Sequence, residues 1–464
     1  MFVELRAHAE RRDIAIFLAC TAQFLSALNM GIGPLMIPNV ATDLGFGPVG
    51  QAWVVSGYAL SFAGFVLLGG RLADIFGGGR TLMLGYAVAM ASAFVATCAP
   101  STAVMIGARI GQGVGAALTV PAALAILATS RSGLPGRSRV LALFAASGGA
   151  GFGLGLAAGG LAADTIGWRW LFGEIGALSA LLTVLTFVLV GRSRRTPGRL
   201  SILPTIWAAT GLMLLAYAVT IGPSGESMGW LSLAAGIVGV CLLAIFVGSQ
   251  ARAREPIMPL ELWTRPHFAL SIISAALIYG AWVSTYYFAA LFMQDALGLS
   301  ATATALFMAP LAFGAAAGSR IAAMLLPTVS SPAKLIASGS IMCAASIVLL
   351  ATPGLSSPWV VVLLLMLVVG SQTVAFVSLN LVALSVAAVG EMGLTGSVFN
   401  ASSQVGGGFA VGILSVVANE FSSSTMDVGY RVTFICASLL ALGAGLIALC
   451  SRSRRKQAAE PAQP

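Results

Sequence analysis

The chain is dominated by apolar runs that are long enough to cross a lipid bilayer, separated by short polar or charged stretches. A helix needs about 20 mostly apolar residues to cross the hydrocarbon layer. Runs of this length recur throughout the chain and predict about fourteen membrane-spanning helices. The expected spans are 14–36, 52–68, 82–98, 103–128, 141–161, 175–190, 203–221, 231–247, 268–292, 303–325, 335–351, 360–386, 393–417 and 432–450.

Composition supports a membrane protein and argues against several other classes. Hydrophobic residues make up 58% of the 464 positions and charged residues only 8%, which is more apolar surface than a soluble domain can bury. The first apolar run is too long for a cleavable signal peptide. The two histidines and six cysteines show no metal-ligand spacing, so we expect no metal site and no cofactor.

The basic residues lie in alternate loops, as the positive-inside rule predicts. The net charge of +9 is therefore not read as a nucleic-acid-binding patch, because the bases do not gather on one face. With a cytoplasmic N-terminus, only Arg109, Arg169 and Arg431 fall outside the cytoplasmic loops. We expect a multi-pass protein of the cell membrane, surrounded by the lipid bilayer, with both termini in the cytoplasm.

The spans group into two sets of six with two helices between them. The expected domains are an N-terminal six-helix bundle at 1–191, a two-helix insertion with cytoplasmic linkers at 192–266, a C-terminal six-helix bundle at 267–450 and a cytoplasmic tail at 451–464. A short repeat supports the division, because residues 318–323 resemble residues 69–74 at the corresponding loop. Repeated halves suggest a transporter with its site between them, near the middle of the membrane.

A glycine-rich stretch, residues 69–80, is expected to form a short turn between the second and third spans. Its glycines allow two helix ends to approach closely, and Asp74 can cap a helix or pair with a base. The stretch resembles the G-x-L-A-D-x-x-G-R-K-x loop of the major facilitator superfamily. Gly70, Asp74 and Gly77 match, and Arg80 keeps one positive charge, but the other basic residues are missing. The alternative is a generic glycine-rich turn.

A positive charge lies inside the fourth span, at Arg109. A guanidinium at membrane depth is costly and needs a partner or water. Residues 109–117 resemble the R-x-x-Q-G-x-G-A-A motif of the same superfamily, with Gln112 among the matched positions. The resemblance implies that Arg109 takes part in proton relay or in organising the site. The alternative is a structural arginine that extends toward the outer surface.

Small residues crowd the fifth span at Gly151, Gly155, Gly159 and Gly160. They resemble the G-x-x-x-G-P-x-x-G-G motif of the antiporters in this superfamily, with Leu156 in place of the proline. Such residues let helices touch backbone to backbone, so the alternative is helix packing alone.

Further stretches resemble the fourteen-span drug:proton antiporter branch. Trp168-Arg169-Trp170, expected at the outer end of the fifth span, is one of them. Trp53 and Tyr58 in the second span and the segments 255–260 and 294–300 also match. The resemblance covers nearly the whole chain and implies a multidrug or antibiotic efflux function.

Polar side chains at membrane depth are the remaining candidates for a substrate and proton pathway. They are Asn29 in the first span and Asn380, Asn400 and Gln404 in the second half, and each can line a cavity or only join helices. In the branch that the chain resembles, the first helix usually carries an acid where Asn29 stands. Because an amide cannot titrate, we hypothesise that Glu174 in the sixth span takes over part of the proton-coupling role. The alternative for Glu174 is an exposed acid at a helix start.

The resemblance implies a secondary active transporter that exports a small drug-like molecule or antibiotic by alternating access, coupled to proton influx. The chain contains no G-x-x-x-x-G-K-[ST] motif for ATP. One alternative is a proton-independent or metabolite exporter of the same fold. A membrane-embedded enzyme is disfavoured because acids are scarce within the spans, and a non-transporting receptor is disfavoured by the buried Arg109.

Overall fold

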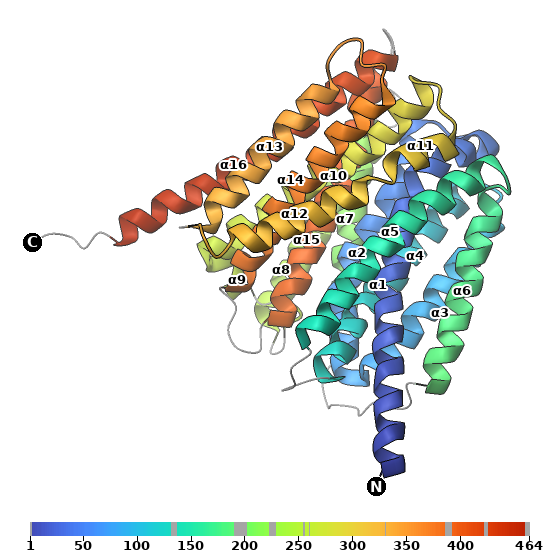
Figure 1. Ribbon diagram of the computed structural model, residues 1–464, viewed down its shortest axis with the longest axis vertical. Coiled ribbons are helices and arrows are strands. Elements are labelled where there is room, and N and C mark those ends of the chain that lie inside the picture. Colours follow the sequence, from blue (N-terminus) through green and yellow to red (C-terminus); the bar gives the residue numbers. More distant parts are fainter. Residues whose placement is uncertain are drawn as a thin grey trace, which may run out of the picture. The chain divides into compact units, whose positions relative to one another are not determined.

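The computed structural model describes residues 2–130, 137–189, 202–221, 229–253, 256–258, 260–329, 331–385, 392–421 and 426–459. Within these residues all regular secondary structure is helical (Figure 1). Thirteen helical segments among the described residues are long and apolar enough to cross a membrane. The helix α5, with 28 residues, adds one more of comparable length. The expected all-helical polytopic fold with about fourteen spans is confirmed.

The chain forms two compact units, and the first comprises Met1–Leu215, Ala234–Ile257 and Ser300–Leu306. In this unit α1 packs against α5, α2 and α3 pack against α4, and α3 also packs against α6. The domain boundaries expected at 191, 266 and 450 stay a prediction. The helices of the N-terminal half are α1 (Phe2–Leu44), α2 (Pro48–Phe76), α3 (Gly78–Thr97), α4 (Thr102–Ser130), α5 (Arg137–Asp164) and α6 (Trp168–Leu189).

The second unit comprises Ala216–Leu233, Met258–Leu299 and Phe307–Pro464. Here α10 packs against α14, α15 and α16, while α13 packs against α14 and α16. The span at Ala301–Leu325 is divided into two helices around Pro310, which cannot continue the hydrogen-bond pattern of a helix. Three further helices contribute residues to both units, namely α7 (Leu203–Ile221), α8 (Gly229–Arg252) and α11 (Ala301–Met308). The helices of the second unit are α9 (Glu261–Thr264), α10 (Pro266–Asp295), α12 (Leu311–Leu325), α13 (Pro332–Leu350), α14 (Pro358–Ser385), α15 (Met392–Phe421) and α16 (Met426–Ala459).

Three helix ends differ from the expectation. The stretch 69–80, expected to be a turn, is helical except at Gly77, whose φ of +88° favours glycine. Trp168, expected to close the fifth span, instead begins α6 after Gly167, whose φ is +84°. The predicted tail is helical as far as Ala459, where α16 ends. Hydropathy marks the apolar part of a helix, and polar turns extend each helix beyond it.

The glycines of α5 allow it to lie directly against the backbone of α1. A Cβ atom built on Gly155 would lie 3.0 Å from Leu28 Cα, and one on Gly159 would lie 3.1 Å from Ile32 Cα. A Cβ atom on Gly151 of α5 would likewise meet the backbone of α1. These distances are too short for a side chain, so the small residues set the close approach of the two helices.

Candidate functional site

Arg109 is buried where three helices of the first unit meet, with only 3% of the residue exposed. Its Nε donates to Val54 O on α2 at 2.9 Å, and its Nη1 donates to Gln112 Oε1 one turn along α4 at 2.7 Å. Nη1 also donates to Asn29 Oδ1 on α1 at 3.4 Å. The face of the Tyr58 ring lies 4.9 Å from the guanidinium carbon. These contacts hold the guanidinium inside the helix layer, so its side chain does not extend to a surface.

All of these partners are neutral. Carbonyl and amide oxygens satisfy N–H groups, and a ring face attracts a cation, but none of them cancels the positive charge. Among the described residues, Arg109 has no ion pair with an acid. A buried charge without an opposite charge is costly, which makes the position a candidate functional site.

Asn29 is held from two sides and is 5% exposed. Its Nδ2 donates to Leu25 O at 3.0 Å, one turn earlier on α1, while its Oδ1 faces Arg109. The amide thus offers its acceptor to the cation and its donor to the backbone. This arrangement explains how an amide is accommodated at membrane depth.

A small cavity lies beside this cluster. Its volume of about 10 Å³ is the size that admits a single water molecule. Polar side chains that line it are Ser26, Asn29, Tyr58, Gln112 and Thr119. The Nε2 atom of Gln112 is buried and has no hydrogen-bond partner in the described part of the chain. The cavity therefore combines a nearby positive charge with an unused N–H donor.

The structure does not place all predicted site residues together. Asn29, Arg109 and Gln112 form one cluster, whereas Asn380 on α14 and Asn400 and Gln404 on α15 belong to the second unit. Gln404 is buried there, and the two asparagines are half-buried.

Glu174 lies on α6 with its side chain exposed. The buried face of α6 is formed by other positions, including Leu171, Ile175 and Ser179. The Arg109 cluster is formed by side chains of α1, α2 and α4, and Glu174 is not among the described residues that contact the guanidinium. Glu174 therefore resembles the exposed acid of the alternative interpretation more than it resembles a buried carboxylate.

The residues of the 69–80 motif surround the turn at Gly77. Asp74 is exposed near the end of α2, and Arg80 is half-buried in the first turn of α3. A Cβ atom on Gly70 would meet open space. Of these positions, Gly77 is the one whose backbone conformation demands glycine.

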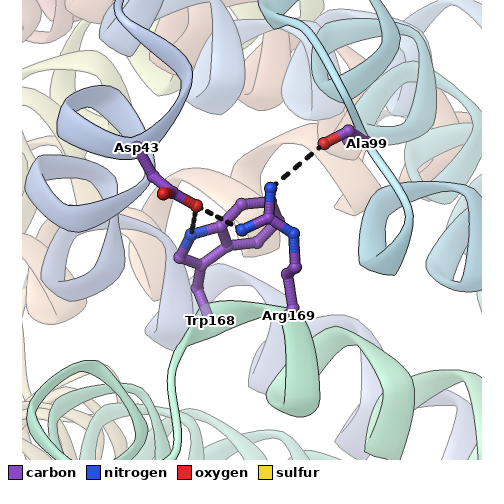
Figure 2. Close-up of polar contacts among 4 residues, drawn as sticks. All are labelled: Asp43, Ala99, Trp168 and Arg169. Carbon is purple, nitrogen blue, oxygen red and sulfur yellow. Dashed lines mark hydrogen bonds and ion pairs between the residues drawn. The ribbon is translucent and has the colours of Figure 1, made fainter.

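Asp43, which the sequence motifs did not indicate, forms a cluster with Trp168 and Arg169 at the C-terminal end of α1 (Figure 2). Arg169 on α6 forms an ion pair with Asp43 and stacks over the ring of Trp168, with the guanidinium carbon 4.1 Å from the ring centroid. Trp168 Nε1 donates to Asp43 Oδ2 at 3.1 Å, and Arg169 Nη2 donates to Ala99 O at 3.4 Å. The cluster joins α1, α6 and the α3–α4 loop. The sequence signal that could have indicated this cluster is Asp43 itself, an acid seven residues beyond the end of the first apolar run.

A second carboxylate at a helix end also joins two helices. It belongs to Asp164, the last residue of α5. Its Oδ2 accepts a hydrogen bond from Thr302 N at 2.7 Å in the first turn of α11, and Thr302 Oγ1 donates to Gly160 O at 3.0 Å. A Cβ atom on Gly160 would lie 2.7 Å from Ala301 O. Gly160 therefore faces α11, while Gly151, Gly155 and Gly159 face α1, so the four glycines serve two interfaces.

These features define a polytopic helical membrane protein with a buried positive charge in its first unit. The chain belongs to the Major Facilitator Superfamily, whose pattern it matches over residues 19–411. It is thus a member of a family of secondary transporters, as the sequence motifs implied.

Among curated relatives, the cephamycin export protein of Amycolatopsis lactamdurans is 35% identical over 303 residues, which is 64% of this chain and 62% of that protein. The puromycin resistance protein of Streptomyces alboniger is 30% identical over 88% of this chain and 82% of that protein. A methylenomycin A resistance protein of Bacillus subtilis is 26% identical over 91% of both chains. The match thus spans less than two thirds of the cephamycin export protein.

Solved structures of transporters share the fold. A bacterial homolog of the human lysosomal transporter Spinster, in an inward-facing and unoccupied conformation, aligns with a TM-score of 0.71 over 97% of this chain and 99% of that chain, at 14% identity. The peptide transporter POT in complex with sulfate aligns with a TM-score of 0.69 over 95% of this chain and 94% of that chain, at 16% identity.

Proposed function

We propose that the chain exports a small organic drug or antibiotic across the cell membrane by alternating access. The observation that carries the proposal is the buried Arg109, held by Asn29 and Gln112 beside a polar cavity in a superfamily transporter. Relatives named for cephamycin export and for puromycin resistance support this direction of transport and this kind of substrate.

Inward proton flow is the proposed driving force. Arg109 stays protonated at physiological pH, and Asn29 has no titratable group, so neither can release a proton. Glu174 is our first hypothesis for the proton carrier. Asp43 and Asp164, each in a defined contact at a helix end, are further candidates from the structure. Asn29 would then be a neutral contact for the substrate.

The second unit would contribute its own polar groups to the transport pathway. Asn380, Asn400 and Gln404 are the proposed contacts there. The turn at Gly77, with Gly70, Asp74 and Arg80 around it, would act in the conformational change between the open states. We place both termini in the cytoplasm, because the basic loops then lie on the cytoplasmic side.

A drug-susceptibility panel in an efflux-deficient bacterial host tests the proposal. Cells that carry the gene should tolerate higher concentrations of at least one antibiotic and accumulate less of it than cells without the gene. Equal susceptibility and equal accumulation across the panel, with the protein present in the membrane, would contradict export.

Proton-independent export is the second candidate, because an amide stands at Asn29 beside the buried arginine. Adding a protonophore separates the two. Export that stops on loss of the proton gradient supports coupling, whereas export that continues supports the second candidate.

A further inference from the structure

We propose that the Arg109 cluster binds an anionic group, a carboxylate, of the transported compound. This inference rests on the proposed export function and deepens it by naming a substrate class.

The charge balance around Arg109 is the first step. Its contacts are the Val54 carbonyl, the Gln112 and Asn29 amide oxygens and the Tyr58 ring. The charge is thus buried at 3% exposure and left uncancelled. An anion that enters the cluster would remove the cost of this isolated charge, whereas a cation would add to it.

Among the described residues, no acid of the neighbouring helices is bonded to the guanidinium. Glu174 on α6 lies next to the cavity-lining Ile175, but its own side chain is exposed. On α1, Asp43 is 14 residues from Asn29, which corresponds to about 21 Å along a helix. On α2, Asp74 is 16 residues from Tyr58, or about 24 Å. The helix α3 contains no acid, and Asp164 ends α5 with its carboxylate bonded to Thr302. The uncancelled charge is therefore a property of the cluster as a whole.

The hydrogen-bonding groups fit a carboxylate. Gln112 Nε2 is a buried donor without a partner in the described part of the chain, on a residue that is 2% exposed and lines the cavity. Ser26 Oγ and Tyr58 OH lie 3.0 Å apart at the same cavity and can supply a hydroxyl donor. A carboxylate oxygen accepts from guanidinium, amide and hydroxyl donors, and these charge-assisted bonds are the stronger ones.

The size of the cavity limits what enters it. A volume of about 10 Å³ admits one group the size of a water molecule, such as a single carboxylate oxygen. The rest of the compound would remain outside this cavity. The cluster therefore selects for a charge, and other parts of the pathway accommodate the body of the compound.

Binding by the purified full-length protein tests the inference without relying on transport. The probes are benzoate and its neutral amide, benzamide, compared by thermal shift at constant ionic strength. We expect benzoate to raise the melting temperature of the wild-type protein and benzamide to have little effect. Arg109→Met should weaken benzoate binding about tenfold or more, because a bond to a charged group is lost.

Gln112→Glu is the second variant, since it places a carboxylate within reach of Arg109 Nη1 and cancels the charge from inside. It should also abolish the benzoate effect while it keeps the packing of the site. The matched control is Arg252→Met, which removes a positive charge at the exposed end of α8 and should bind benzoate as the wild type does.

Three results would overturn the inference. The first is an equal rise in melting temperature with benzoate and with benzamide. The second is no change in melting temperature with benzoate. The third is a rise in melting temperature with benzoate that persists in Gln112→Glu. If Arg109→Met fails to fold, Gln112→Glu alone decides. Binding of benzoate without export of any compound would instead contradict the proposed function and leave the anion site in place.

Discussion

Asn29 Oδ1 accepts a hydrogen bond from Arg109 Nη1 at 3.4 Å, so a neutral amide stands where an acid would form a buried ion pair. The amide keeps its other end bonded to Leu25 O at 3.0 Å. The contact therefore fixes the position of the guanidinium but leaves its charge available. This separates two tasks that one carboxylate could perform together, namely holding the arginine and carrying a proton.

The close contact of α5 with α1 predicts opposite effects for two neighbouring glycines. Gly155→Ala should lower stability by about 1–3 kcal/mol, because the new methyl group meets the Leu28 backbone. Gly153→Ala is the matched control, since a Cβ atom there meets open space, and it should be neutral or stabilising by up to about 1 kcal/mol. Thermal unfolding of the purified protein measures both. Equal effects would contradict the described packing.

The turn at Gly77 predicts different effects for a second pair of glycine-to-alanine substitutions. Gly77→Ala forces a Cβ atom into a backbone conformation with φ of +88° and should cost about 1–3 kcal/mol. Gly70→Ala, inside α2 and facing open space, should not destabilise the protein. We expect lower expression and a lower melting temperature for the first variant alone. A stable, fully active Gly77→Ala protein would show that the turn can adopt another conformation.

Proton coupling is tested at Glu174. If this carboxylate carries the proton, Glu174→Gln should abolish export driven by an imposed pH gradient in inside-out vesicles while it preserves substrate exchange. Glu261→Gln, at an exposed acid of α9 with no proposed role in the pathway, is the matched control and should export as the wild type does. Unchanged pH-driven export in Glu174→Gln would move the proton site to Asp43 or Asp164, or support proton-independent export.

The sequence was sufficient to locate Arg109, Gln112 and Asn29, because a polar residue inside an apolar run stands out from its neighbours. Hydropathy also separated the spans. In lipid the backbone N–H and C=O groups must be hydrogen-bonded within the segment, so each long apolar run forms one helix. The contact of Asp43 with Arg169 could not be inferred, because it joins residues 126 positions apart at two helix ends. The same holds for Asp164 and Thr302. The two interfaces of the α5 glycines depend on which helix lies against each face, and sequence motifs do not show that.

Topology gives a further prediction. Fusions of green fluorescent protein and of alkaline phosphatase after Arg199 and after Lys456 should both report a cytoplasmic location, as the basic loops require. Fluorescence without phosphatase activity is the expected pattern at each site. Phosphatase activity at either site would mean that the number of spans before it is wrong.

Export by Arg109→Met provides the most direct test of the site. The variant and the wild-type protein are expressed at equal membrane levels in an efflux-deficient host, and accumulation of an antibiotic that the wild type excludes is measured. We predict that cells with Arg109→Met accumulate the antibiotic as cells without the gene do, because a charge kept at membrane depth serves function. Accumulation as low as with the wild-type protein would contradict a functional role for the Arg109 cluster.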